Sequence, residues 1–296
     1  MIQSIKAYGF ALLSVMLWAT AAAVSKLLLG KGLNALQLLL FTSFFATVSL
    51  VLVAASNGKL KLVKHFSVKE WIQLGAIGAI GIFLYHICYF GSLQYLPAQE
   101  TTIINYLWPL MTVLIAIPLL HESFSIRKLG ATVLSLAGVW IVVSNGNIFS
   151  FRFDNAFGVA LAFSGAVLYG LFAVLGKKSK IDKTSSMLAY CAVTFALSLI
   201  SVPVFSRIPA ISLLQLIGTA WLGICIGIGF WLWFLALHYG DTAKISNLAY
   251  LVPFISLVFV YVLLAEEIMW FSIAGLVLIV AGIFAQTWPK PDFKRQ

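Results

Sequence analysis

The positions of the charged residues constrain this sequence more than any other feature. Between them lie ten uncharged runs of at least 19 residues, of which the longest has 33. A helix needs about 20 apolar residues to cross the hydrocarbon core of a bilayer, so even the longest run is too short for two crossings. The sequence therefore predicts ten transmembrane helices, over residues 7–25, 32–58, 71–99, 101–121, 129–151, 155–176, 184–206, 208–240, 245–265 and 268–289.

The composition excludes a soluble domain. Hydrophobic residues make up 62% of the chain and charged residues 9%, whereas a soluble domain carries about 25% charged residues. Continuous apolar runs favour helices over the alternating strands of a membrane barrel. Cys88, Cys191 and Cys225 all lie in apolar runs and show neither a disulfide framework nor metal-ligand spacing. We therefore expect an all-α membrane protein with no metal or cofactor.

Lysine and arginine are distributed unevenly between the loops. With a cytoplasmic N-terminus, 15 of the 19 lie on the cytoplasmic side, and only Lys26, Lys31, Arg152 and Arg207 lie outside. This bias predicts an inner (plasma) membrane protein with both termini in the cytoplasm. The net charge of +10 is thus attributed to membrane orientation, and no nucleic-acid partner is expected. The first run exceeds a typical signal-peptide core of about 7–15 residues, so we expect a retained helix.

The two halves of the chain resemble each other. Shifting the first half by 144 residues lays 90–138 over 234–282, with 13 identities among 49 pairs. Chance explains matched leucines and valines, but it explains poorly the scarce residues that fall in register. These pairs include Tyr106/Tyr250, Pro109/Pro253, Glu122/Glu266 and Gly138/Gly282.

The repeat has a consequence for topology. A shift of 151 residues pairs Trp18 with Tyr169 and Lys26 with Lys177. We expect two repeats, residues 1–150 and 151–296, each with five helices. Because five is odd, the second repeat must cross the membrane in the opposite sense, and inverted repeats suit alternating access around a central site.

These features resemble the EamA branch of the drug/metabolite transporter superfamily. The resemblance covers essentially the whole chain and is best over 98–122 and 242–266. Residues 105–109, Asn-Tyr-Leu-Trp-Pro, are similar to the branch that exports aromatic amino acids, whereas the second half has only Tyr-Leu-Val-Pro at 250–253. The resemblance implies a carrier with a central cavity formed by spans one, three, four, six, eight and nine. It also implies export from the cytoplasm.

The fourth run holds the most informative polar residues. Thr101, Asn105, Trp108 and Thr112 are spaced to share one helix face, and polar groups facing lipid are costly. Interhelical hydrogen bonding is an equal alternative for the threonines. For Asn105 and Trp108 we favour the cavity, because an amide binds a carboxylate or amine while an indole covers an apolar body.

Prolines and acidic residues mark the same region. Pro109 and Pro253 are predicted inside their helices, where each frees a carbonyl and bends the helix, with or without ligand contact. Glu100, at the outer end of span four, is a candidate gating residue. Glu122 and Glu266 are interpreted as helix-end residues that anchor neighbouring loops.

Aromatic residues supply the remaining candidates, with helix packing as the open alternative. His86 lies at mid-depth, and an interhelical hydrogen bond is favoured for it over proton transfer. Close helix contact is predicted at Gly75, Gly78 and Gly81. The candidate substrate-binding aromatic residues are Tyr85, Tyr89, Trp233, Tyr169, Trp18 and Tyr250.

The predicted function is secondary transport of a small amphipathic metabolite, with aromatic or other neutral amino acids as the best substrates. No acidic residue lies at mid-membrane, which favours a facilitated carrier over obligate proton coupling. The four histidines are scattered, and no zinc-protease, nucleophile-elbow or P-loop motif occurs, so no enzyme is expected. A small-multidrug exporter, a lipid flippase and a membrane enzyme remain alternatives. The expected partners are the substrate and the lipid bilayer; the oligomeric state is open, and a monomer is compatible.

Overall fold

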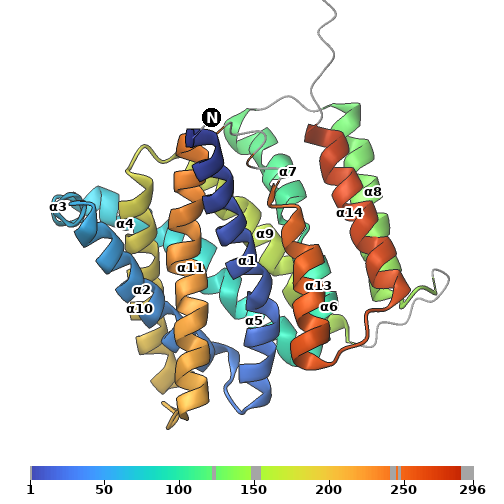
Figure 1. Ribbon diagram of the computed structural model, residues 1–296, viewed down its shortest axis with the longest axis horizontal. Helices are drawn as coiled ribbons and strands as arrows, with labels where there is room; N and C mark the ends of the chain where they lie inside the picture. Colours follow the sequence, from blue (N-terminus) through green and yellow to red (C-terminus); the bar gives the residue numbers. More distant parts are fainter. Residues whose placement is uncertain (1, 122–124, 148–154, 241–244, 246–247, 288–296) are drawn as a thin grey trace, which may run out of the picture.

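The computed structural model describes residues 2–121, 125–147, 155–240, 245 and 248–287, and within these ranges all regular structure is helical (Figure 1). A π-helical segment, η1, joins α4 to α5. The elements of the first half are α1 (Ile2–Gly30), α2 (Ala35–Ser56), α3 (Leu60–Lys64), α4 (Val68–Gly78), η1 (Ala79–Leu84), α5 (Tyr85–Tyr95), α6 (Ala98–Asn105), α7 (Trp108–Leu120) and α8 (Ile126–Val143).

The second half contributes five long or apolar helices. Within the described ranges, seven helices are long and apolar enough to cross a bilayer, and three shorter apolar helices cover Leu129–Val143, Leu251–Leu264 and Trp270–Phe284. Each of these helices overlaps one of the uncharged runs. That all ten cross the membrane remains a prediction. The elements are α9 (Ala156–Lys178), α10 (Lys183–Phe205), α11 (Leu213–Tyr239), α13 (Leu251–Leu264) and α14 (Trp270–Thr287).

The fourth span is broken at its centre. Helix α6 ends at Asn105 and α7 begins at Trp108, because Pro109 has no N–H to donate to the Asn105 carbonyl. Similarly, α13 begins two residues before Pro253, and the Ala249 carbonyl accepts a hydrogen bond from the Tyr106 hydroxyl. The prediction that both prolines lie inside continuous helices is therefore wrong. Each stands in the first turn of a helix, where proline is favoured.

Helices α7 and α13 end in the same unusual backbone conformation. His121 and Ala265 lie 144 residues apart, and each terminates its helix in the left-handed region with φ of 54°. Residues other than glycine rarely adopt this region. The coincidence extends the internal repeat from side-chain identity to backbone geometry.

Helices α8 and α14 pack antiparallel through small residues (Figure 1). A Cβ added to Gly138 would lie 2.5 Å from the Gly275 carbonyl oxygen, and one added to Gly282 would lie 2.8 Å from the Ala131 carbonyl oxygen. A shift of 144 residues converts one contact into the other. The repeat also relates α1 to α9 and α5 to α11, and the α1–α11 contact accordingly has its counterpart in the α9–α5 contact. This is expected if the second half is an inverted copy.

This packing makes a prediction about stability. Gly138→Ala is expected to destabilise the protein by about 1–3 kcal/mol, because the added methyl group meets rigid backbone. Gly130→Ala, on the same helix, has no atom within 4 Å of the added group and should leave the melting temperature equal or higher. Thermal unfolding in detergent measures both. Equal melting temperatures for the two variants would contradict the packing.

The glycines of the third span pack as predicted at two of three positions. A Cβ added to Gly78 would lie 2.9 Å from Cα of Tyr190, and one added to Gly81 would overlap the Phe172 ring. These contacts join the third span to α10 and α9. Gly75 has nothing within 4 Å, so the prediction of close contact is wrong there, because this residue faces away from both helices.

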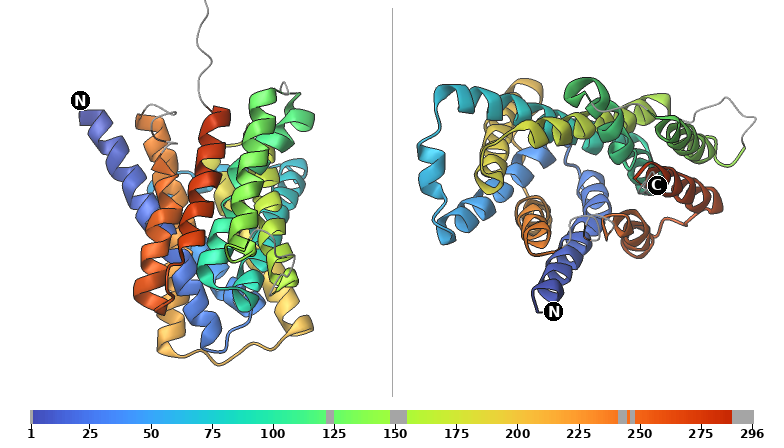
Figure 2. Two further views of the ribbon diagram at one scale, coloured as in Figure 1. Left: turned by 90° about the vertical axis from the view of Figure 1, so that its right-hand side faces the viewer. Right: turned by 90° about the horizontal axis from the view of Figure 1, so that it is seen from above.

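One end of the bundle, here named the basic end, is marked by an ion pair. Lys59 Nζ lies 2.7 Å from Asp182 Oδ2, which places the loops 57–69 and 177–183 together. Burial disfavours the charge of Asp182, but the Lys59 ammonium and hydrogen bonds from Ser185 hold the pKa of this carboxyl below its ordinary value. The start of α1 and the end of α14 lie at the same end (Figures 1 and 2).

The opposite end is held by amide side chains. Gln37 Nε2 donates to the Arg207 carbonyl at 2.8 Å, and Gln215 Nε2 donates to the Lys31 carbonyl at 3.0 Å. The structure thus separates Lys31 and Arg207 from the loops at the basic end. This is the grouping that the charge distribution predicted.

Candidate functional site

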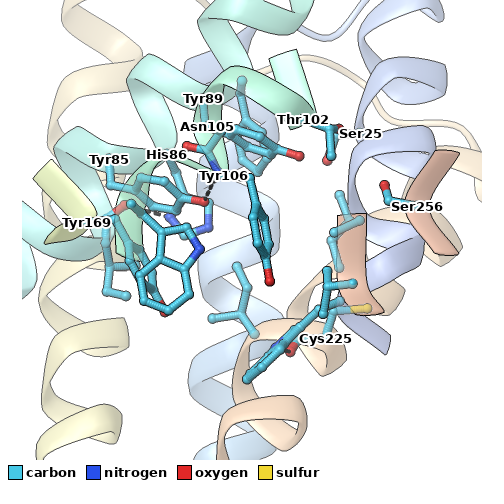
Figure 3. Close-up of a pocket in the computed structure, with 18 of the residues that line it drawn as sticks. Ser25, Tyr85, His86, Tyr89, Thr102, Asn105, Tyr106, Tyr169, Cys225 and Ser256 are labelled. Atoms are coloured by element: carbon cyan, nitrogen blue, oxygen red, sulfur yellow. Dashed lines mark hydrogen bonds between the residues drawn. The ribbon is translucent and has the colours of Figure 1, made fainter. Parts of the chain in front are cut away.

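A central pocket lies between the two halves of the chain (Figure 3). Its lining comes from α1, the third span, α6 and α7, α9, α11 and α13. These are spans one, three, four, six, eight and nine, the six expected to form the cavity. The predicted site residues that line this central pocket are Trp18, Tyr85, His86, Tyr89, Asn105, Trp108 and Tyr169.

A second cavity adjoins the central pocket and is here named the vestibule. The two share Trp18, Trp108, Tyr169, Phe230 and Ala249 as lining residues. The vestibule continues to Lys177 and Lys183 at the basic end. The central pocket is therefore connected toward the end of the bundle that carries the basic loops.

Asn105 brings the most informative polar group into the central pocket. Its Nδ2 donates to the Tyr85 hydroxyl at 3.2 Å, whereas its Oδ1 is buried and has no hydrogen-bond partner. An unpaired buried carbonyl oxygen costs about 1–3 kcal/mol. Oδ1 faces Gly165 of α9, 3.3 Å from the position that an added Cβ would take, so a bound ammonium or amide group would remove this cost once the amide turns toward the pocket.

His86 presents a second acceptor. Its Nδ1 lies 2.7 Å from the Ile82 carbonyl oxygen, which can only accept, so Nδ1 carries the hydrogen. The Nε2 of the neutral ring is then an acceptor on a side chain that lines the pocket. The prediction of an interhelical hydrogen bond for this histidine is wrong, because Ile82 lies one turn earlier on the same span. Ser25 Oγ, also on the lining, is buried and unpartnered.

Aromatic rings form the walls where the pocket meets the vestibule. The ring centroids of Trp108 and Tyr169 lie 4.9 Å apart, and those of Tyr169 and Tyr85 lie 5.0 Å apart. On the other wall, Trp18 lies 5.3 Å from Trp233, which lines the vestibule. Such walls suit a flat apolar or aromatic body, because ring edges and faces attract one another at these separations.

The central pocket is mostly apolar and is uncharged. Among the described residues that line it, none is Asp, Glu, Lys or Arg, and the hydrogen-bonding groups are hydroxyls, an amide and an imidazole. An isolated net charge is costly to bury without a partner. The site therefore favours a ligand whose own charges sum to zero.

Several predicted residues lie outside the pocket. Thr101 is buried and accepts a hydrogen bond from Ser92 at 3.3 Å, and Thr112 donates to the Trp108 carbonyl at 2.8 Å. The break after Asn105 ends the common helix face that the prediction assumed. The alternative of interhelical hydrogen bonding holds for Thr101, whose bond joins α6 to α5, and is wrong for Thr112, whose bond stays within α7.

The remaining predicted residues also lie away from the pocket lining. Tyr250 packs on Phe284 with centroids 5.9 Å apart, and only its neighbour Ala249 reaches the pocket. Glu100 stands in the first turn of α6, within electrostatic range of Lys26. Glu122 lies outside the described residues.

Some lining residues were missed from the sequence. Ser25 follows Trp18 by seven residues on α1, a helical spacing that could have revealed it. Thr102 and Tyr106 flank the helix break, which the periodic pattern did not anticipate. For Ser256 on α13 the sequence carries no distinguishing signal, because its position on the pocket depends on how α13 is rotated against α1 and α6.

Curated relatives of this chain are transporters. It is 27% identical over 186 residues to the aromatic amino acid exporter YddG of Ancylobacter novellus, covering 60% of this chain and 63% of the exporter, so less than two thirds of that relative is spanned. An uncharacterized transporter of Archaeoglobus fulgidus is 27% identical over 93% of this chain and 95% of its own. The uncharacterized transporter YyaM of Bacillus subtilis is 26% identical over 85% of each chain.

Structural and family comparisons agree with these relatives. A solved crystal structure matches the fold with a TM-score of 0.68 at 23% identity, covering 95% of this chain and 96% of the other. The model of the EamA-like transporter family matches twice, over residues 5–144 and 156–287. Each match falls within one predicted repeat. The chain is a multi-pass membrane protein and belongs to the EamA-like transporter family.

Proposed function

We propose that this protein is a carrier that exports a small amphipathic metabolite by alternating access, with aromatic or other neutral amino acids as its substrates. The observation that carries the proposal is the uncharged, aromatic central pocket with the unpaired Asn105 oxygen. The amino acid exporter among the relatives supports the substrate class and the direction of transport.

The pocket offers complementary groups for a zwitterion. Asn105 Oδ1 and His86 Nε2 accept from the substrate ammonium, while the hydroxyls of Tyr89 and Ser25 donate to its carboxylate. The rings of Trp108 and Tyr169 cover an aromatic side chain. Alternating access requires that the bound substrate favour the occluded packing of the two halves over either open packing.

The proposal includes a membrane topology. Ten helices cross the inner membrane in two inverted repeats, residues 1–150 and 151–296, with both termini and the basic end in the cytoplasm. The excess of basic residues at this end supports the orientation. The vestibule then opens inward, and the present conformation receives substrate from the cytoplasm. The protein acts as a carrier and not as an enzyme, and needs no cofactor.

Transport by purified protein in liposomes tests the proposal. Labelled Trp and Phe are expected to cross faster than Thr, which lacks a ring, and to do so without a pH gradient, because no acidic group lines the described pocket. Protein-free liposomes provide the control. If none of the three amino acids crosses, the substrate class is wrong; a strict requirement for a pH gradient would overturn the facilitated mechanism.

A further inference from the structure

Lys26 holds the end of a helix at the side of the pocket remote from the vestibule. Its Nζ donates to the Leu93 carbonyl at 2.5 Å and to the Leu96 carbonyl at 2.6 Å. Both carbonyls belong to the last turn of α5 or its cap. A cation is favoured there because the C-terminal carbonyls of a helix carry a partial negative charge.

Glu266 holds the start of the next helix. Its carboxylate oxygens accept from the backbone N–H groups of Ala98 at 3.1 Å and Gln99 at 3.4 Å, in the first turn of α6. The Gln99 side chain donates to the Glu267 carbonyl at 3.0 Å and accepts from Ser272 at 2.9 Å. The predicted loop-anchoring role of Glu266 is confirmed, and the anchored turn belongs to the other half of the chain.

The two contacts form one clasp around the Leu96–Pro97 turn. The Lys26 ammonium also interacts electrostatically with the Glu266 carboxylate. The clasp joins α1 and the α5–α6 turn, from the first half, to the segment between α13 and α14, from the second half.

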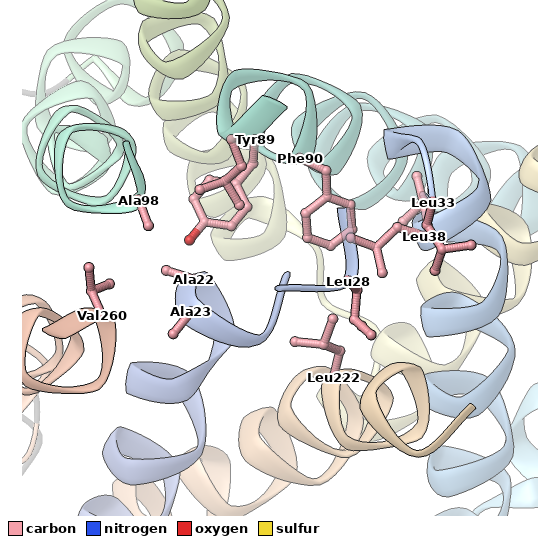
Figure 4. Close-up of a cluster of buried hydrophobic side chains, with 12 residues drawn as sticks. Ala22, Ala23, Leu28, Leu33, Leu38, Tyr89, Phe90, Ala98, Leu222 and Val260 are labelled. Carbon is pink, nitrogen blue, oxygen red and sulfur yellow. The ribbon is translucent and has the colours of Figure 1, made fainter. Parts of the chain in front are cut away.

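The clasp binds the backbone of residues whose side chains pack in a buried apolar cluster at this end of the bundle. Leu93 and Ala98 belong to a buried apolar cluster with Ala22, Tyr89 and Val260 (Figure 4). This cluster packs α1, α5, α6, α11 and α13 together beside the central pocket, which also includes Tyr89. Releasing the turn would therefore loosen the apolar seal between the pocket and this end.

The internal repeat relates Lys26 of the clasp to a lysine of the second half. Lys26 corresponds to Lys177 in the second half, yet Lys26 closes one end while Lys177 lines the open vestibule at the other. Two positions related by the repeat thus lie at opposite ends of the bundle. We propose that the Lys26–Glu266 clasp is the gate of the transport pathway at the end opposite the vestibule, and that it opens when the vestibule closes.

This inference rests on the proposed carrier mechanism but not on any particular substrate. Its test uses a cysteine at the pocket residue Ser256, in a chain whose three native cysteines are replaced by alanine, reconstituted in one orientation. A membrane-impermeant thiol reagent is applied from either side. Glu266→Gln and Lys26→Met are each expected to raise the labelling rate from the Lys26 side about fivefold or more, and to leave or lower the rate from the vestibule side.

Neighbouring charges supply matched controls. Glu267→Gln and Lys31→Met remove the same charges beside the clasp and should leave both labelling rates unchanged. Gln99→Met weakens the clasp without removing a charge and should act in the same direction if the charge variants fail to fold. Unchanged labelling, or an equal rise from both sides, would show a purely structural role and overturn the gate. Failure of amino acid transport alone would leave the labelling result valid.

Discussion

Asn105→Ala is expected to lower the initial transport rate at low substrate concentration by about 10- to 100-fold. The variant removes the unpaired Oδ1 and the Nδ2 that donates to the Tyr85 hydroxyl. Loss of a hydrogen bond to a charged group costs about 1.5–3 kcal/mol, which corresponds to this range. Trp108→Ala is expected to lower transport of Trp and Phe by a similar factor, because it removes one wall of the pocket.

Matched variants separate binding from folding. Thr112→Ala lies one turn beyond Trp108 and loses only a bond to the Trp108 carbonyl, so transport should remain near the wild-type rate. Trp71→Ala removes an exposed indole in the first turn of α4, outside the lining of the pocket, and controls for loss of a tryptophan. Normal transport by folded Asn105→Ala and Trp108→Ala proteins would show that the pocket face of span four has been misassigned.

Net charge on the ligand is expected to abolish transport. Tryptamine carries the indole and the ammonium of tryptophan without its carboxylate, and indole-3-propionate carries the carboxylate without the ammonium. Each should cross at least about 100-fold more slowly than Trp, because an unpaired charge in the described, uncharged pocket costs several kcal/mol. Uptake is measured in liposomes, with passive permeation through protein-free liposomes subtracted.

The two analogues also discriminate between functions. Rapid transport of tryptamine would support a small-multidrug exporter for organic cations, although the described pocket lining lacks the carboxylate such a site needs. Rapid transport of indole-3-propionate would require a cation that enters the pocket, for which the vestibule residues Lys177 and Lys183 are the nearest source. Either result would contradict the zwitterion site.

The positions of the helices followed from the sequence because charge is costly inside a bilayer. Each apolar helix overlaps one uncharged run, and the Lys59–Asp182 pair places two of the predicted cytoplasmic loops at the same end. The repeat predicted from the Pro109/Pro253 pair agrees with the structure, because a helix begins just before each proline. The same two helices end at His121 and Ala265 with the same left-handed backbone conformation.

The site was predicted less completely, for identifiable physical reasons. The spacing that placed Thr101 and Trp108 on one helix face assumed an uninterrupted helix. Pro109 removes a backbone hydrogen bond, so α7 does not continue the helical rotation of α6. The clasp could not be predicted, since Lys26 and Glu266 lie 240 residues apart and meet through the backbone of a third segment. Sequence patterns report residue spacing within a helix and not the partners that packing brings to it.

Accessibility of the pocket from each side tests the central claim most directly. With the clasp intact and the three native cysteines replaced by alanine, Ser256→Cys should be labelled by an impermeant thiol reagent from the vestibule side and, at a different rate, from the Lys26 side. Saturating substrate should slow both reactions, because the occluded state excludes the reagent. Labelling from one side only, while transport continues at its normal rate, would contradict a pocket shared by two inverted halves and opened to each side in turn.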